Sequence, residues 1–188
     1  MTQTTIETRG GLPREMQALL RDYPRDTWPE NPNFAASIQN WMGAHQMFRQ
    51  LGEITRSDSE DYLDGHLEET RYAARLSHFG NLLLRNLHGH HSWEDRKFFP
   101  ELKTADRRFA EGLDILESDH VALDELLERF KSQANRVVQL SQLDPGNIRD
   151  EAGAVQATAE QLEAFLHRHL SDEEDLAVPI LLHHKMRG

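Results

Sequence analysis

The chain has 188 residues, of which 38% are hydrophobic and 28% are charged, a composition that fits one globular domain with a sizeable core. Acidic residues outnumber basic ones by 32 to 21, and the formal net charge of -11 argues against nucleic acid or an anionic membrane as a partner. The chain has no cysteine, which excludes disulfides, thiolate metal sites and cysteine nucleophiles. Histidine is over-represented instead, with 11 residues.

The N-terminus is polar and lacks the apolar run of a signal peptide. No stretch of the sequence approaches the roughly 20 apolar residues of a membrane span. We therefore expect a soluble cytoplasmic protein.

Proline divides the sequence into two parts. Four of the seven prolines, at 13, 24, 29 and 32, fall within residues 1–32, which we expect to form an extension: a short helix begun by Pro13, followed by extended chain. The rest of the chain is rich in strong helix formers. Residues 33–188 are therefore predicted to form one all-α domain.

Helical spacing of apolar residues recurs in four places along the chain. The four stripes cover residues 34–48, 76–98, 113–137 and 155–180. Pro100 is expected to stop the second helix. Its start is open, because Ser57 and Glu60 could form a capping box while Gly65 and Gly80 could interrupt the helix. Four such stripes predict an up-down four-helix bundle.

Each stripe carries a histidine at a position where an apolar residue is expected: His45, His90, His120 and His169. Burying an unpaired polar group costs about 2 to 7 kcal/mol, so four coincident histidines need a partner. Glu94 and Glu173 follow two of them by four residues, about 40° away on the same helix face. His91 diverges from His90 by roughly 100°, and Glu94 points between the two.

Five histidines and two carboxylates are thus predicted to converge on the bundle axis. Imidazole with carboxylate suits iron, zinc or manganese. Two six-coordinate ions need roughly twelve positions. Five histidines, two bridging carboxylates and a bridging oxo or hydroxo group fill all but one of these. Dioxygen, peroxide, nitric oxide or an anion could bind at the open position.

These residues resemble the hemerythrin family, specifically the bacterial hemerythrin-like (HHE) cation-binding domain, over roughly residues 34–184. The resemblance lies in His45, HHSWEDRKFFPEL at 90–102, ESDH ending at His120 and HLSDEEDLAVPIL at 169–181. His-x-x-x-Glu followed by proline six residues after the glutamate occurs twice, ending at Pro100 and at Pro179.

The resemblance implies a non-haem di-iron centre in a four-helix bundle, with iron rather than zinc or manganese. Glu94 and Glu173 would bridge two irons (Fe2+/Fe3+). His45 and His90 would bind one iron, while the other would be bound by three histidines: His91, His120 and His169.

Two features depart from the family pattern. Oxygen-carrying hemerythrins have a second histidine in the third helix, where this chain has Leu116; His91 could compensate, because it points toward the second metal. The last-helix carboxylate could be Glu173 or Glu174, of which the stripe and the internal repeat favour Glu173. Glu174 would then lie on a solvated face, as would Asp95 and Asp175, although Asp95 could also orient a histidine.

We therefore expect a di-iron protein that binds dioxygen or a related small molecule, in sensing, storage or protection, and not a dedicated enzyme. One alternative is a di-iron enzyme acting on peroxide, nitric oxide or ferrous iron; another is a metal-free helical interaction module. A ferritin-like oxidase is disfavoured, because Glu-x-x-His occurs once, at Glu117–His120, instead of twice. Most of the other six histidines are expected at the surface.

Overall fold

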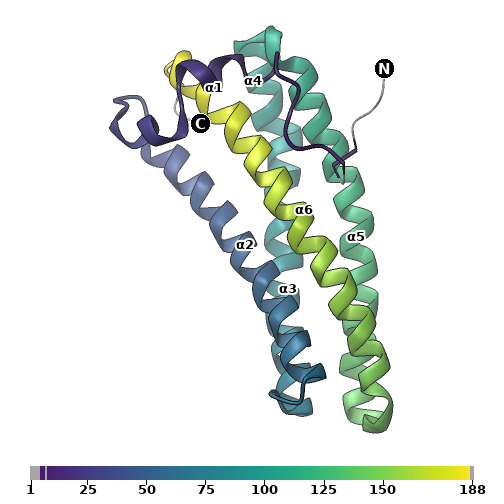
Figure 1. Cartoon of the computed structure of the whole chain (residues 1–188). Coiled ribbons are helices and arrows are strands. Elements are labelled where there is room, and N and C mark those ends of the chain that lie inside the picture. Colours follow the sequence, from purple (N-terminus) through teal and green to yellow (C-terminus); the bar gives the residue numbers. More distant parts are fainter. Residues whose placement is uncertain (1–4, 7, 187–188) are drawn as a thin grey trace. The chain divides into compact units, whose positions relative to one another are not determined.

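The computed structural model describes residues 5, 6 and 8–186, so residues 1–4 and 7 of the predicted extension lie outside the described part. The described chain is helical and contains no strand, which confirms the predicted all-α bundle (Figure 1). In chain order the elements are α1 (Ala18–Asp22), the 3-10 helix η1 (Arg25–Glu30), α2 (Ala36–Leu63), α3 (Glu69–Trp93), the π-helix η2 (Glu94–Phe98), α4 (Phe99–Ala105), the 3-10 helix η3 (Arg107–Phe109), α5 (Ala110–Leu143), the 3-10 helix η4 (Pro145–Asn147) and α6 (Ile148–His183). None of the described helices combines the length and apolar character needed to cross a bilayer.

The fold divides into two compact units, and each of the four long helices contributes a segment to both. Unit 1 contains the described residues of Met1–Gln46, His90–Val121 and His167–Gly188. Unit 2 contains Met47–Gly89 and Ala122–Leu166. The long helices form because their apolar positions recur every three to four residues, so that one face of each helix is buried.

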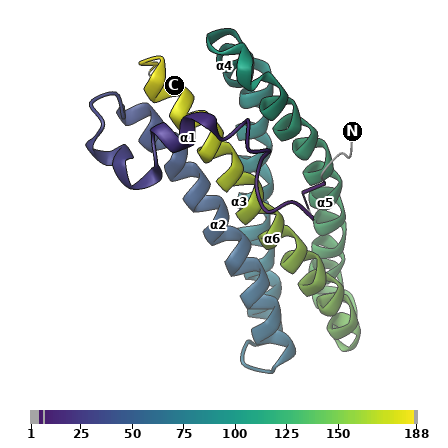
Figure 2. The same cartoon turned by 45° about the horizontal axis from the view of Figure 1, so that its top comes forward.

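The N-terminal segment forms part of the core of unit 1. Its side chains Leu12, Met16 and Trp28 are buried in the same cluster as residues of α4, α5 and α6. Packing is tightest at Gly112 of α5, where an added Cβ would lie 2.9 Å from Leu176 Cδ2 and 3.1 Å from Met16 Sδ. Figures 1 and 2 both show this purple segment beside the yellow C-terminal part of α6.

Two expectations for this segment were wrong. Pro13 opens a turn, in which the Met16 amide donates to the Pro13 carbonyl, and α1 begins only at Ala18. The stretch predicted to be extended forms η1, which includes Pro29. Burial of Trp28 explains the difference, because its indole Nε1 donates to the Tyr23 carbonyl and closes the segment into a compact turn.

The boundary between α2 and α3, in unit 2, settles the helix start that the sequence left open, in favour of an interruption at Gly65. Ser57 and Glu60 form no capping box, because α2 continues to Leu63, and the Ser57 hydroxyl donates to the Ile54 carbonyl within the helix. The connection turns at Gly65, whose φ of 80° lies in the left-handed region that suits glycine. The carboxylate of Glu68 then accepts from the Thr70 and Arg71 amides at the start of α3.

Pro100 does not stop the helical path, contrary to expectation. The chain passes from α3 through the π-helical turn η2 directly into α4, where Pro100 occupies the first turn. Proline is tolerated there, because a first-turn amide needs no intrahelical partner. The wider π turn keeps both Glu94 and Phe98 buried on the inner side.

Candidate metal centre

All seven predicted ligands lie in unit 1, and the structure brings them together. One helix or turn positions each of them: α2 carries His45, the last turn of α3 carries His90 and His91, η2 opens with Glu94, α5 carries His120, and α6 carries His169 and Glu173. Six of the seven are buried, with at most 4% of their surface exposed, and His90 is partly buried. The periodic positions predicted from sequence are therefore core positions.

The seven side chains form two groups that could each hold a metal ion. The three-histidine group consists of His91, His120 and His169, and the four-donor group consists of His45, His90, Glu94 and Glu173. Within each group, one ligand atom from every residue lies within 4.8 Å of the others. This division matches the one that the family resemblance implies.

Glu94 and Glu173 reach toward both groups, and we call them the spanning carboxylates. Glu94 Oε1 lies 3.0 Å from His90 Nε2, while its Oε2 lies 3.7 Å from His120 Nε2. Glu173 Oε2 lies 3.5 Å from His45 Nε2, while its Oε1 lies 3.1 Å from His169 Nε2. Each carboxylate thus directs one oxygen toward each group, which is the geometry that a bridging ligand requires.

Three histidines are held from their outer side by other carboxylates, which we call the outer carboxylates. The outer Nδ1 atoms lie 3.1 Å from Glu174 Oε1 for His45, 2.7 Å from Asp95 Oδ1 for His120, and 3.2 Å from Asp119 Oδ2 for His169. A carboxylate at Nδ1 fixes the ring and leaves Nε2 for a metal.

The outer carboxylates correct one detail of the sequence interpretation, agree with another and add a residue that it missed. Glu174 does not lie on a solvated face, because it is buried and faces His45. Asp95 is partly exposed but contacts His120, which agrees with the orienting alternative. Asp119 was missed, although it directly precedes His120. The Asp175 side chain is partly exposed and pairs with Arg25.

Trp41 is a further contributor to the site, and the apolar spacing of the sequence marks it only as a core residue. Its indole Nε1 donates to Glu94 Oε1 over 2.7 Å, and its ring centroid lies 4.2 Å from that of His45. The spacing of four residues between Trp41 and His45 places both on one face of α2. Trp41 therefore orients one spanning carboxylate and covers one imidazole.

The charges in the site are mutually compensating. Burial lowers the pKa of His45, but Glu174 and the spanning carboxylates raise it more, to about 9. Burial likewise lowers the pKa of His120, while Asp95 and Glu173 raise it to about 10. For Glu173, burial raises the pKa, but the surrounding imidazoles bring it well below its usual value. Without a metal, protonated imidazoles thus neutralise the carboxylates, and a cation could replace those protons.

His91 provides the sharpest test of whether a metal fits. Burial and the neighbouring His120 and His169 hold the pKa of His91 well below its ordinary value, so the ring is neutral. Among the described residues, neither ring nitrogen of His91 has a hydrogen-bond partner, although both nitrogens are buried. The ring stacks on His120 at a centroid distance of 4.0 Å. A cation bound by one His91 nitrogen would satisfy one of these two buried atoms, so the donor set fits a metal.

A family model decides the relationship of the chain to known proteins. The model of the hemerythrin HHE cation-binding domain matches residues 36–181. The chain belongs to this family. Comparisons with curated proteins and with solved structures found no match. The predicted family is thus confirmed, and its description as cation-binding agrees with the two donor groups of this HHE domain.

Other positions complete the account of this HHE domain. Leu116 is fully buried in the apolar core of unit 1. Glu117 faces Lys103, with Oε1 2.8 Å from Nζ, and belongs to neither donor group, which weakens the ferritin-like reading. Most of the remaining six histidines were expected at the surface, and all six are exposed: His66, His78, His88, His167, His183 and His184.

Proposed function

We propose that this HHE domain binds two iron ions, one in each donor group, and holds dioxygen or a related small molecule at an open iron position. The observation that supports two ions is the placement of the spanning carboxylates. A single ion would use one oxygen of each carboxylate, whereas both Glu94 and Glu173 also direct a second oxygen toward the other group.

The ligand count supports a vacant position. Five histidines supply five positions and two bridging carboxylates supply four, so a solvent-derived bridge leaves about one of roughly twelve positions open. When bound, iron supplies the redox chemistry that dioxygen binding requires. The protein residues hold the geometry: Trp41 donates to Glu94, and the outer carboxylates fix His45, His120 and His169.

The surroundings favour a small uncharged ligand. A pocket of about 110 Å³ lies against Trp41 and is lined mainly by apolar side chains: Ile38, Trp41, Trp93, Phe98 and Leu181, with Ser37. Because the donors are almost fully buried, a ligand must be small enough to reach them through the packed bundle. We infer a role in sensing, storage or protection.

Anaerobic loading with ferrous iron, followed by metal analysis, tests the proposal. We expect about two irons per chain; fewer than about one would overturn it. An absorption band that appears in air and reverses under argon would support ligand binding. Steady consumption of peroxide or nitric oxide by the loaded protein would instead favour the enzymatic alternative.

A further inference from the structure

We propose that the N-terminal segment, through Arg9 and Arg25, positions the metal-binding imidazoles of His169 and His45. This inference rests on the proposed function, because it treats those imidazoles as iron ligands. Both arginines precede residue 36, where the match to the HHE family begins. The segment would thus be a part of the centre that this chain adds to the family domain.

Arg9 acts on the three-histidine group through Asp119. Its guanidinium is buried, with 2% of the side chain exposed, and its Nη1 donates to Asp119 Oδ1 over 2.9 Å while its Nη2 donates to Asp119 Oδ2. Asp119 Oδ2 also faces His169 Nδ1. Two parallel bonds from one guanidinium fix the plane of the carboxylate, and this carboxylate fixes the imidazole.

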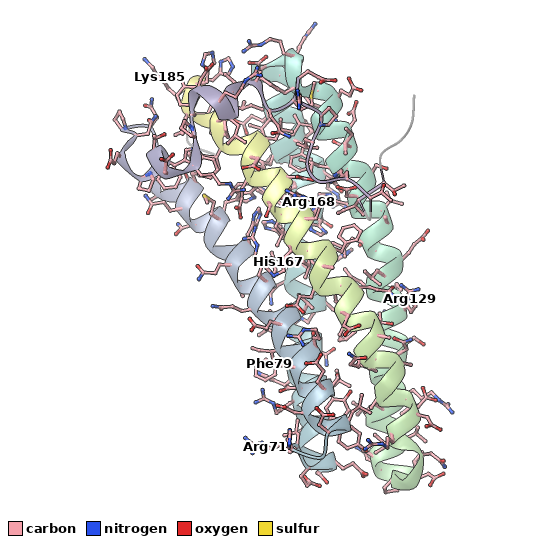
Figure 3. The ribbon with its side chains drawn as sticks, in the orientation of Figure 1. Arg71, Phe79, Arg129, His167, Arg168 and Lys185 are labelled. Atoms are coloured by element: carbon pink, nitrogen blue, oxygen red, sulfur yellow. The ribbon has the colours of Figure 1, made fainter. Side chains whose placement is uncertain are left out.

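Arg9 is itself fixed by α6. Its Nε donates to Asp172 Oδ2 over 2.8 Å, and Asp172 Oδ1 lies 2.6 Å from Arg168 Nη2. Arg168 also donates to the carbonyl oxygen of Gly10, the next residue after Arg9. Figure 3 shows Arg168 on α6 beside the N-terminal segment. The contacts around Arg9 therefore leave little freedom for Asp119.

Arg25 makes the corresponding connection to the four-donor group. Its Nη1 donates to Glu174 Oε2 over 2.7 Å, and the other oxygen of Glu174 faces His45 Nδ1. Its Nε and Nη2 donate to Asp175 and to the Ser171 carbonyl on α6. Each arginine thus reaches a different donor group through one outer carboxylate.

Removing either arginine should loosen an imidazole and not only the segment. Without Arg9, the buried carboxylates of Asp119 and Asp172 would lose their shared cation, so Asp119 would reorient or recruit water. His169 would then lose its fixed partner. Changing the group behind a metal-bound histidine typically weakens metal binding about 10- to 100-fold, and a residue one step further out should act at the lower end.

The test compares full-length Arg9→Met and Arg25→Met with Arg14→Met, which replaces an exposed arginine of the same segment. Protein loaded anaerobically with Fe2+ is mixed with a ferrous chelator, and iron release is followed. We expect release about tenfold faster in both test variants, and wild-type release in Arg14→Met. Release at the wild-type rate in both test variants, with helicity retained, would overturn the proposal.

Imidazole N–H signals in ¹H–¹⁵N spectra of the metal-free protein provide a readout that a purely structural role would not move. Arg9→Met should accelerate water exchange of the Nδ1–H of His169 and leave that of His45 unchanged, and Arg25→Met should do the reverse. Equal effects on both rings in each variant would indicate general loosening and overturn the proposal.

These two measurements separate failure of this inference from failure of the proposed function. If wild-type protein binds no iron, the proposed function fails, whereas the imidazole signals still decide whether the arginines position the rings. If Arg9→Met does not fold, Arg9→Lys takes its place, because lysine keeps the charge but cannot bind both oxygens of Asp119 in parallel. Its His169 signal should exchange faster than in wild type, and a wild-type signal would overturn the proposal.

Discussion

The buried imidazoles of the centre are asymmetric in their surroundings. On the inner side, Nε2 atoms of His45, His120 and His169 face the spanning carboxylates, and on the outer side their Nδ1 atoms face the outer carboxylates. An isolated buried neutral histidine would be satisfied by one acceptor and one donor, whereas here carboxylates, which only accept, face both ring nitrogens. The two-sided arrangement positions the rings for a cation, because it sets both the orientation and the available nitrogen.

This asymmetry leads to a prediction for two histidines of α6. His169→Ala should lose iron from the three-histidine group, because only two histidines of that group would remain beside the spanning carboxylates. His167→Ala is the matched control, since His167 lies on the same helix but is exposed; Figure 3 labels it on α6. Metal analysis with far-UV circular dichroism measures both effects. Full iron retention in His169→Ala would place the site elsewhere, as would retention in Glu94→Ala.

Tyr72 in unit 2 predicts how stability changes at alkaline pH. Burial raises the pKa of Tyr72 to about 12, and its hydroxyl lies 3.1 Å from Ser59 Oγ. The unfolded chain ionises near pH 10, so the stabilisation is complete below pH 10 and is lost as the pH rises to 12. The free energy of unfolding should fall by up to about 3 kcal/mol across this window.

Tyr72→Phe should remove this contribution to the pH dependence. Urea unfolding of both proteins between pH 8 and pH 12 measures it. At pH 8 the variant should be less stable by about 1 kcal/mol, owing to the lost hydrogen bond. The gap should narrow, and then reverse, above pH 10. Parallel curves for the two proteins would show that Tyr72 ionises normally in the folded state.

The helices were predictable where the apolar spacing is regular, and less so at their ends. All four stripes became long helices, because sustained burial of one face outweighs local preferences. Ser57 and Glu60 left the start of the second helix open, because a polar pair inside a long helix resembles a cap. Pro100 misled because the sequence does not reveal a π turn, which inserts one extra residue and carries the helix past the proline.

In the turn between α2 and α3, Gly65 adopts a left-handed backbone conformation that other residues rarely adopt. Gly65→Ala should destabilise the protein by about 1 to 2 kcal/mol, because alanine is strained at its φ of 80° while an added Cβ meets no atom within 4 Å. Gly153→Ala is the matched control: Gly153 lies inside α6 and also has open space around its Cβ. That substitution should stabilise the protein by about 0.5 to 1 kcal/mol.

Thermal and urea unfolding of the two variants measure these effects. Because steric contacts are absent at both positions, the difference in sign isolates the backbone requirement. Destabilisation by both substitutions to the same extent would show that the space around the glycines, and not the backbone angle at Gly65, controls the outcome.

At the scale of the whole molecule, the inner donors of the centre could be predicted from the sequence, whereas the contacts of the N-terminal segment with the centre are seen only in the structure. The inner donors were predictable because they repeat with helical spacing and with His-x-x-x-Glu. The contacts of Arg9 and Arg25 were not, since they join residues more than 100 positions apart and neither arginine belongs to a periodic pattern. The segment containing them looked like an extension because its prolines obscured the buried side chains that anchor it.

Because all seven donors lie in unit 1, iron binding should protect that unit selectively. We expect slower hydrogen exchange for amides that exchange through local opening in residues 90–121 and 167–186. At iron concentrations 100-fold above the dissociation constant, their exchange should be up to about 100-fold slower than in the metal-free protein. Local openings within residues 69–89 and 122–143 leave the donors intact, so their rates should change little. Hydrogen–deuterium exchange of metal-free and anaerobically loaded protein measures both sets, with His169→Ala as the control that loses the protection. If both sets slowed equally, the donors of unit 1 would open only together with unit 2. In that case, local opening of either unit would release the iron.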